Sequence, residues 1–163
     1  MRRNHRNHLT LGNFFADNSP GDEFELTLQQ WELEKRAMRP KEKTIYLVDF
    51  YANWCQPCLE FKPKFSALAI KWRKSPYYDG YKKNGWNLEF VAFDCARTHS
   101  SGTTCQKNGV PHYPYIKLIH PGGRKYKSLE NDLSVDELFE IILQQMDSAG
   151  AGPVQFENNH DEL

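Results

Sequence analysis

The chain has 163 residues, of which 39% are hydrophobic and 13% aromatic, enough for one domain of ordinary size plus tails. Lys plus Arg and Asp plus Glu both number 21, so no excess charge draws nucleic acid or an anionic membrane, and we expect neither as a partner. The apolar runs are only a few residues long, against the roughly 20 needed to cross a bilayer, so we expect no membrane span.

The first 22 residues (1–22) mix His, Asn, Arg, Gly and Pro without an apolar period, and we expect them to form a flexible arm. Residues 24–38 carry first a strand-like alternation and then a helix-like period that ends before Pro40. The predicted domain therefore covers residues 23–147. Residues 148–163 are rich in Gly, Asn and acidic side chains, and we expect a flexible tail there.

A buried strand is predicted over 45–51, because this stretch is apolar and rich in β-branched and aromatic residues, with Asp49 as its one interruption. Two cysteines, Cys55 and Cys58, follow the strand and are separated by Gln-Pro. Residues 58–74 then repeat apolar side chains at helical spacing, and we expect the next proline to end this helix.

The downstream elements are predicted from the same patterns. They are, in order, an aromatic loop over 75–86, a buried strand over 88–93, a strand over 115–120, a Pro-Gly-Gly turn over 121–123 and an edge strand over 124–127. Ser134 with Glu137 three residues later predicts a capping box that opens a helix ending near Met146.

The two close cysteines predict disulfide exchange. Exchange needs a thiolate, and a free cysteine with a pKa of about 8.5 is mostly protonated at neutral pH. If Cys55 lies at the start of the predicted helix, the unpaired backbone N–H groups and the helix dipole stabilise its thiolate. We therefore expect Cys55 to be the nucleophile and Cys58 to resolve the mixed disulfide. Gln56-Pro57 brings no imidazole, which favours a milder oxidant than a loop containing His.

Asp49 is the candidate proton carrier. An unpaired carboxylate in a buried strand is costly, so we expect its pKa to be raised and the group to shuttle protons for Cys58. The alternation of the apolar residues around it leaves open the alternative that Asp49 points outward into solvent.

A zinc site is an alternative use of the four cysteines, with Cys95 and Cys105 completing four sulfur ligands. Zinc knuckles usually keep each cysteine pair close in sequence, whereas nine residues separate this pair. The histidines are scattered without ligand spacing or a cysteine partner. We therefore expect no bound metal.

Residues Val48 to Cys58 read Val-Asp-Phe-Tyr-Ala-Asn-Trp-Cys-Gln-Pro-Cys, which resembles the active-site segment of the thioredoxin superfamily, particularly of protein disulfide isomerase domains. Tyr113-Pro114 resembles the cis-proline site of the same family. The resemblance covers about 24–146 and implies an α/β thioredoxin fold, with a central mixed β-sheet flanked by helices.

The resemblance also implies roles for individual residues. Asp49 would be the buried proton-transfer acid, and Tyr113-Pro114 would be a cis peptide bond that faces the cysteines across a substrate groove. We expect the following residues to contact substrate: Trp54, Gln56, Pro57, Tyr113 and Pro114. Gln56-Pro57 departs from the Gly-His and Gly-Pro loops of relatives, and Ala92 stands where many relatives have a lysine paired with the buried acid.

The segment that contains Cys95 and Cys105 resembles thioredoxin domains of quiescin sulfhydryl oxidases, in which such a pair is bridged. The resemblance implies a structural disulfide between these two residues. A second redox pair that relays electrons stays open as the alternative.

Together these features predict a thiol-disulfide oxidoreductase, similar to protein disulfide isomerase, that needs no cofactor. The residues His160-Asp161-Glu162-Leu163 match a retrieval address, which predicts the endoplasmic reticulum lumen and a retrieval receptor that binds the C-terminus. No apolar stretch follows the basic start of the chain, so no signal peptide is visible, and we expect a mature or truncated form.

The expected partners are client proteins that contain cysteines and an oxidoreductase that recharges the dithiol. Two alternatives stay open: a disulfide reductase of the thioredoxin kind, and a client-binding module whose redox activity is secondary. The reduction potential would distinguish a reductase from an oxidoreductase of the isomerase kind. A Cys55→Ala variant that still captures clients would favour the binding module.

Overall fold

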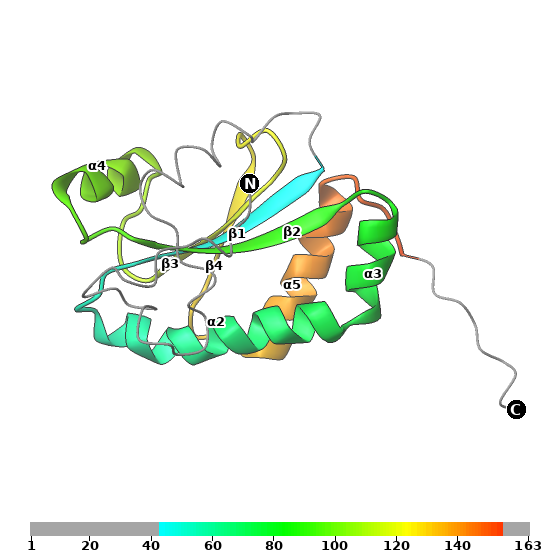
Figure 1. Cartoon of the computed structure of the whole chain (residues 1–163), viewed down its shortest axis with the longest axis horizontal. Helices are drawn as coiled ribbons and strands as arrows, with labels where there is room; N and C mark the ends of the chain where they lie inside the picture. The colour runs from blue at the N-terminus through cyan, green and yellow to red at the C-terminus, as the bar shows by residue number, and fades with distance from the viewer. Residues whose placement is uncertain (1–42, 155–163) are drawn as a thin grey trace, which may run out of the picture.

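The computed structural model describes residues 43–154 of the chain (Figure 1). The strand and helix predicted over 24–38, the N-terminal arm and the retrieval motif lie outside these residues. The described elements are, in order, β1 (Thr44–Tyr51), α2 (Gln56–Lys74), α3 (Pro76–Lys83), β2 (Asn87–Asp94), α4 (His99–Lys107), β3 (Tyr115–Ile119), β4 (Tyr126–Leu129) and α5 (Val135–Ser148).

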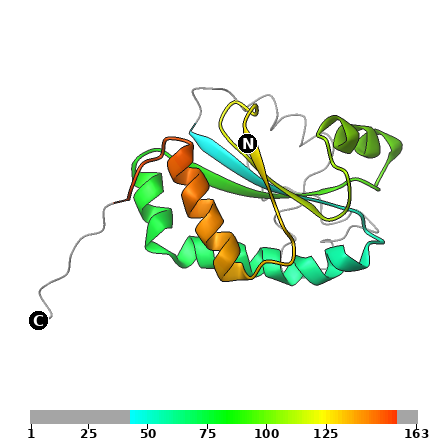
Figure 2. The same ribbon diagram turned by 180° about the vertical axis from the view of Figure 1, so that it is seen from behind.

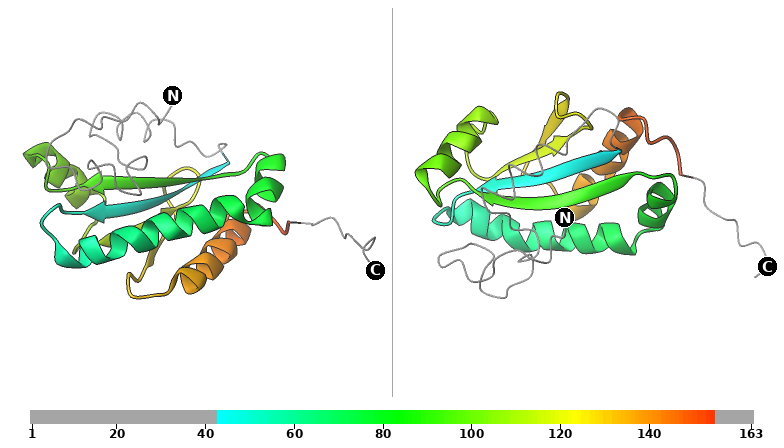
Figure 3. Two further views of the ribbon diagram at one scale, coloured as in Figure 1. Left: turned by 60° about the horizontal axis from the view of Figure 1, so that its bottom comes forward. Right: turned by 45° about the horizontal axis from the view of Figure 1, so that its top comes forward.

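These strands form one mixed sheet in the order β2-β1-β3-β4 (Figure 3). β1 pairs with β2 in parallel and with β3 antiparallel, and β3 pairs antiparallel with β4. β1 and β2 are buried along almost their whole length, which explains why both read as continuous apolar runs rather than as alternating patterns. The strands predicted over 45–51, 88–93 and 115–120 are confirmed.

Different helices cover the two faces of the sheet. α2, α3 and α5 lie together against one face, and Figure 2 shows α5 running at an angle to α2, with one end beside it. α4 lies at the opposite face, near the end of the sheet where α2 begins (Figure 1). Alternate side chains of β1 therefore pack into two separate cores, Ile45, Leu47 and Tyr51 on the α2 face and Tyr46, Val48 and Phe50 on the α4 face.

The aromatic loop predicted over 75–86 is wrong for most of its length, because Pro76 opens α3 instead of only ending α2. Ser75 serves both helices: its N–H donates to the Trp72 carbonyl at 3.1 Å, and its hydroxyl accepts the Tyr78 N–H at 3.4 Å. A proline costs nothing in the first turn of a helix, where its missing N–H would have no partner. Tyr81 stacks on Trp72 with ring centroids 5.9 Å apart, so the aromatic residues of this segment pack in the core.

Two further differences concern the second half of the chain. α4 was not predicted, because His99–Lys107 consists mainly of small polar residues without an apolar period. The edge strand predicted over 124–127 forms instead at Tyr126–Leu129. The connection is longer than a two-residue turn, since the His120 N–H reaches the Lys125 carbonyl at 2.9 Å, and both glycines after Pro121 have positive φ.

α5 begins as predicted. The Ser134 hydroxyl accepts the Glu137 N–H at 3.1 Å, and the Glu137 carboxylate accepts the Ser134 N–H at 3.1 Å, which completes the capping box. The α2 residue Lys64 donates to the carbonyls of Asn131 at 3.0 Å and Leu133 at 2.7 Å, and so ties the loop before α5 to α2. None of the helices within residues 43–154 is long and apolar enough to span a bilayer.

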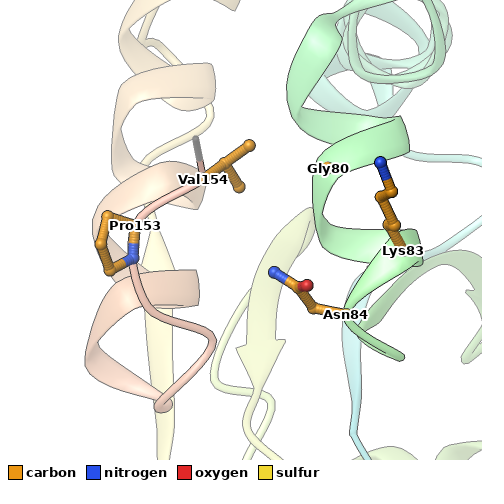
Figure 4. A pocket seen from close by; sticks show the side chains of 5 residues that line it. All are labelled: Gly80, Lys83, Asn84, Pro153 and Val154. Atoms are coloured by element: carbon orange, nitrogen blue, oxygen red, sulfur yellow. The ribbon is translucent and has the colours of Figure 1, made fainter. Parts of the chain in front are cut away.

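The chain continues to pack after α5. The Ala151 N–H donates to the Met146 carbonyl at 3.0 Å, and Ala151 is buried in the core. Figure 4 shows Val154 pointing across a shallow hollow toward Gly80 of α3. A Cβ at Gly80 would overlap Val154, so the glycine makes room for this close approach.

Candidate active site

Cys55 is the N-cap residue of α2. Its backbone is extended, with φ −86° and ψ 117°, and its sulfur accepts the Cys58 N–H at 3.2 Å. Pro57 occupies the first turn, where its lack of an N–H does no harm, and no acidic side chain lies in that turn. The sulfur of Cys55 therefore lies where a helix presents unpaired N–H groups and positive partial charge, as the sequence predicted.

The structure joins Cys55 and Cys58 in a disulfide whose Cα atoms are 5.2 Å apart. Cys58 has no exposed surface, and Cys55 retains 5%. The neighbouring side chains are exposed to solvent: Trp54 is 70% exposed, and both residues between the cysteines are exposed. A partner can therefore approach the pair from the side of Cys55, in line with the predicted division between an attacking and a resolving cysteine.

Asp49 is fully buried, so the alternative of an outward-facing residue is wrong. It alternates with Leu47 and Tyr51, and these two side chains pack in the same core cluster as Cys58. Its partners in the sheet register are Ala92 on β2 and Ile116 on β3, and neither of them brings a charge.

Neither carboxylate oxygen of Asp49 has a hydrogen-bond partner. Burial alone raises the pKa of this carboxyl from 3.8 to about 8, because removal from water disfavours the charged form. The carboxyl is thus protonated at neutral pH, and its pKa lies near that of an ordinary thiol.

The Tyr113-Pro114 peptide bond is cis, as the resemblance implied. Pro114 is buried directly before β3, and the Tyr113 ring meets the Trp54 ring edge to face, with centroids 6.0 Å apart. The cis-proline loop therefore contacts the residue that immediately precedes Cys55. The structure brings the predicted substrate-binding residues to one end of the sheet.

Cys95 and Cys105 form a second disulfide, with their Cα atoms 5.8 Å apart. It lies in the core on the α4 face, whereas Cys55 and Cys58 belong to the core on the α2 face. The four sulfurs do not converge on one point, so the zinc interpretation is wrong for this arrangement. Within residues 43–154, His, Cys, Asp and Glu side chains form no group of three or more that could hold a metal.

Sequence reasoning missed Asp94, the last residue of β2. It is 2% exposed, and its carboxylate accepts the Ala96 N–H at 2.9 Å and the backbone N–H of Asn53, two residues before Cys55. Burial raises the pKa of Asp94, while these two hydrogen bonds and nearby Arg97 oppose the rise. An acid at the end of a buried strand was the available signal.

Comparison with known proteins identifies the family. The sequence profile named Thioredoxin matches residues 25–144, which is most of the chain. The chain belongs to the thioredoxin family. Its Cys55–Cys58 pair agrees with thiol-disulfide oxidoreductase chemistry.

Curated thioredoxin-domain relatives include DnaJ homolog subfamily C member 10 of Rattus norvegicus, which is 38% identical over 124 residues, covering 74% of this chain and 13% of the relative. Protein disulfide isomerase-like 2-2 of Oryza sativa subsp. japonica is 29% identical over 96 residues, covering 59% and 22%. Sulfhydryl oxidase 1 of Pongo abelii is 30% identical over 104 residues, covering 62% and 12%. The predicted relationship to disulfide isomerases and sulfhydryl oxidases is confirmed. This chain spans less than a quarter of each of these proteins.

Among solved structures, the J-Trx1 fragment of ERdj5 superimposes with a TM-score of 0.56 at 18% identity, covering 76% of this chain and 51% of that one. This likeness concerns the fold alone, and it confirms the predicted thioredoxin fold.

Proposed function

We propose that this thioredoxin-family chain is a protein disulfide oxidoreductase of the isomerase kind, whose reacting atoms are the sulfurs of Cys55 and Cys58. The observation that carries the proposal is the position of Cys55 as the N-cap of α2, with its sulfur accepting the Cys58 N–H. That position stabilises a thiolate, and the thiolate is the nucleophile in disulfide exchange.

In the reductive direction, the Cys55 thiolate attacks one sulfur of a client disulfide. A bond forms between Cys55 and that sulfur, and the second client sulfur leaves as a thiolate that takes a proton from water. The Cys58 thiolate then attacks the Cys55 sulfur, the Cys55–Cys58 disulfide forms, and the first client sulfur leaves. The client disulfide is reduced and the dithiol is oxidised by two electrons. The reverse sequence oxidises a client dithiol, and an incomplete sequence isomerises one.

Asp49 supports the resolving step. Cys58 has no access to water, so its thiol needs a nearby acceptor before it can attack. The ionised Asp49 carboxylate takes the Cys58 proton in the reductive direction, and the protonated acid returns it in the oxidative direction. Its pKa of about 8 favours both transfers, because neither partner holds the proton much more strongly than the other.

The clients are extended protein segments that carry a cysteine. The cis bond before Pro114 presents the backbone of Tyr113 for strand-like pairing with such a segment. Exposed Trp54 supplies apolar contact beside the dithiol, and Gln56 and Pro57 form the surface that a client meets above Cys55.

The compartment is the endoplasmic reticulum lumen. Two observations support it: the motif His160–Leu163 and the protein disulfide isomerase-like relatives. A retrieval receptor would bind the motif, and a second oxidoreductase would recharge the dithiol. Removal of the last four residues should release a secreted, otherwise active protein from cells.

Alkylation kinetics test the proposal. In the reduced chain, Cys55 should react with iodoacetamide at pH 7 at least tenfold faster than free cysteine, because a thiolate is already present. A Cys58→Ser variant should trap mixed disulfides with clients. A rate no faster than that of free cysteine would refute the catalytic role.

A disulfide reductase is the second candidate, since Gln56-Pro57 lacks the imidazole that would make a strong oxidant. Equilibration with glutathione distinguishes the two functions. A potential near −270 mV would favour a reductase, and one near about −180 mV would favour oxidation and isomerisation. If Cys55→Ala leaves client capture and the cellular effect intact, a binding module replaces both.

A further inference from the structure

We propose that the Cys95–Cys105 disulfide is a positioning bond for the exchange site, which holds the loop carrying Trp54 and Cys55 at a fixed distance from the loop carrying Tyr113. This inference rests on the proposed function, because it concerns the groove in which a client segment would be bound.

Cys95 is connected to the loop before Cys55. Its N–H donates to the Tyr51 carbonyl at 2.8 Å, at the end of β1. The preceding residue, Asp94, pairs with Tyr51 in the sheet, and its carboxylate accepts the backbone N–H of Asn53. The backbone around Cys95 therefore holds the segment that leads into Trp54 and Cys55.

Cys105 is connected to the cis-proline loop. Its carbonyl accepts the Val110 N–H at 3.1 Å, shortly after the end of α4. Val110 and Tyr113 pack against the core cluster that contains both cysteines of this disulfide. The Lys117 ammonium, on β3, donates to the Asn108 carbonyl at 2.8 Å and adds a second attachment for the same loop.

The covalent bond matters because α4 has little else to hold it. Of the described strands and helices, none packs extensively against α4, and Figure 1 shows it apart from the layer of α2, α3 and α5. Only Ser101, Thr104 and Cys105 of this helix are buried. Without the disulfide, the end of β2 and the end of α4 would lose their direct link, and the two loops could move apart.

The contact at risk is the one between the Trp54 and Tyr113 rings, whose centroids are 6.0 Å apart. These rings lie on the two loops that border the proposed groove. A client segment would bind both sides of the groove, so its affinity depends on their separation. The reaction of a small disulfide that contacts only Cys55 does not depend on this separation.

The test is a Cys95→Ala/Cys105→Ala variant of the full chain, compared with the wild type on two substrates. One is a peptide with an internal disulfide between extended segments, and the other is cystamine, which is too small to span the groove. We expect the KM for the peptide to rise about fivefold or more, because small misplacements of binding groups have large effects. The peptide kcat and the rate with cystamine should stay within about twofold of the wild type.

An Ile142→Ala variant is the matched control. Ile142 is fully buried on α5, which carries neither loop, so its truncation destabilises the domain by opening a cavity in the core on the α2 face. Assays run at a temperature where both variants are folded should leave the Ile142→Ala KM unchanged. If both variants raise the KM equally, or if the folded double variant keeps the wild-type KM, the positioning role is overturned.

If the double-alanine variant does not fold, Cys95→Ser/Cys105→Ser takes its place, because serine nearly keeps the size of both side chains while the covalent bond is lost. The peptide KM of this variant should rise by a similar factor, and an unchanged KM in the folded variant would overturn the inference. A wild-type chain that reduces neither substrate would instead refute the proposed function, which separates the two failures.

Discussion

The two disulfides of this chain are almost equally buried, yet their electrostatic surroundings are opposite. Cys55 is 5% exposed and Cys95 is 3% exposed. The sulfur of Cys55 accepts an N–H at the start of α2, whereas Cys105 lies near the end of α4 and the sulfur of Cys95 is 4.0 Å from the Phe93 carbonyl oxygen. The backbone groups around the Cys55 sulfur carry positive partial charge, and those around the second pair carry negative partial charge. Only the first environment therefore favours a thiolate.

A buried carboxyl accompanies each pair, and these also differ. Neither carboxylate oxygen of Asp49 has a hydrogen-bond partner. Asp94 accepts two backbone N–H groups, and only its Oδ2 lacks a partner. Helix polarity and the hydrogen bonds of the neighbouring acid therefore distinguish the proposed reactive pair from the proposed structural pair, whereas solvent exposure does not.

The largest expected effect is on the rate of disulfide reduction, which should depend on the Cys55–Cys58 pair and not on the Cys95–Cys105 pair. Cys55→Ser should lower the rate of disulfide reduction at least about 10³-fold, because it removes the nucleophile. Cys95→Ala/Cys105→Ala should keep the rate with cystamine within about twofold. If the second variant lost as much activity as the first with cystamine, Cys95 and Cys105 would be a relay pair instead.

The second effect concerns the two acids. The raised pKa of Asp49 means that the folded protein keeps a proton that the unfolded chain releases above pH 3.8. The unfolding free energy should therefore fall as the pH rises from about 4 to about 8, by up to about 1.4 kcal/mol per pH unit, and then level off. Asp49→Asn should remove this slope and slow the resolution of mixed disulfides.

Urea denaturation of the reduced and oxidised chains between pH 4 and pH 9 measures this effect. Asp94→Asn is the control: its carboxyl is also raised in pKa, but two N–H donors and Arg97 oppose the rise, so the change in slope should be smaller. A wild-type chain and an Asp49→Asn variant with parallel pH profiles would contradict the assignment.

The third expected effect is on the unfolding free energy, and here the loss of the Cys95–Cys105 bond should matter more than the loss of the Cys55–Cys58 bond. The Cys95–Cys105 bond closes a longer loop than the Cys55–Cys58 bond, so its removal should cost about 3 kcal/mol of unfolding free energy against about 2 kcal/mol. Equilibrium denaturation of the two double-alanine variants checks this difference. Equal losses would show that loop length is not the deciding factor.

The smallest effect concerns a single charge. Pro57→His should place an imidazole beside Cys55, lower the pH midpoint of its alkylation by about one unit and make the chain a stronger oxidant. Gln106→His puts the same group beside Cys105 and should change neither the midpoint nor the potential. A shift of the same size in both variants would indicate a general charge effect.

The sequence was sufficient for the parts of the site that depend on local chemistry. The helix start at Cys55 follows from the cysteine spacing and the preceding strand. The apolar neighbours of Asp49 indicated its burial, although their alternation left an outward-facing position open. The cis bond at Tyr113-Pro114 required the family resemblance, since a proline in isolation predicts only a loop or an edge.

The rest depended on contacts that local patterns do not record. Pro76 ends α2 and opens α3 at once, because Ser75 caps both helices. α4 has no apolar period, and its place is fixed by Cys105 and by the carbonyls that its last turn presents. The hydrogen bond between the Asp94 carboxylate and the Asn53 N–H joins residues that are far apart in the sequence, and no local pattern predicts it.

The packing of Val154 against Gly80 determines where the chain leaves the domain. α3 follows the far end of α2, and 19 helical residues at 1.5 Å each put about 28 Å between that end and Cys55. Anything attached beyond Val154 is therefore tethered on the side of the domain remote from the dithiol. A partner that binds the chain beyond Val154 would therefore leave the dithiol free, so the proposed retrieval and the proposed exchange would not compete.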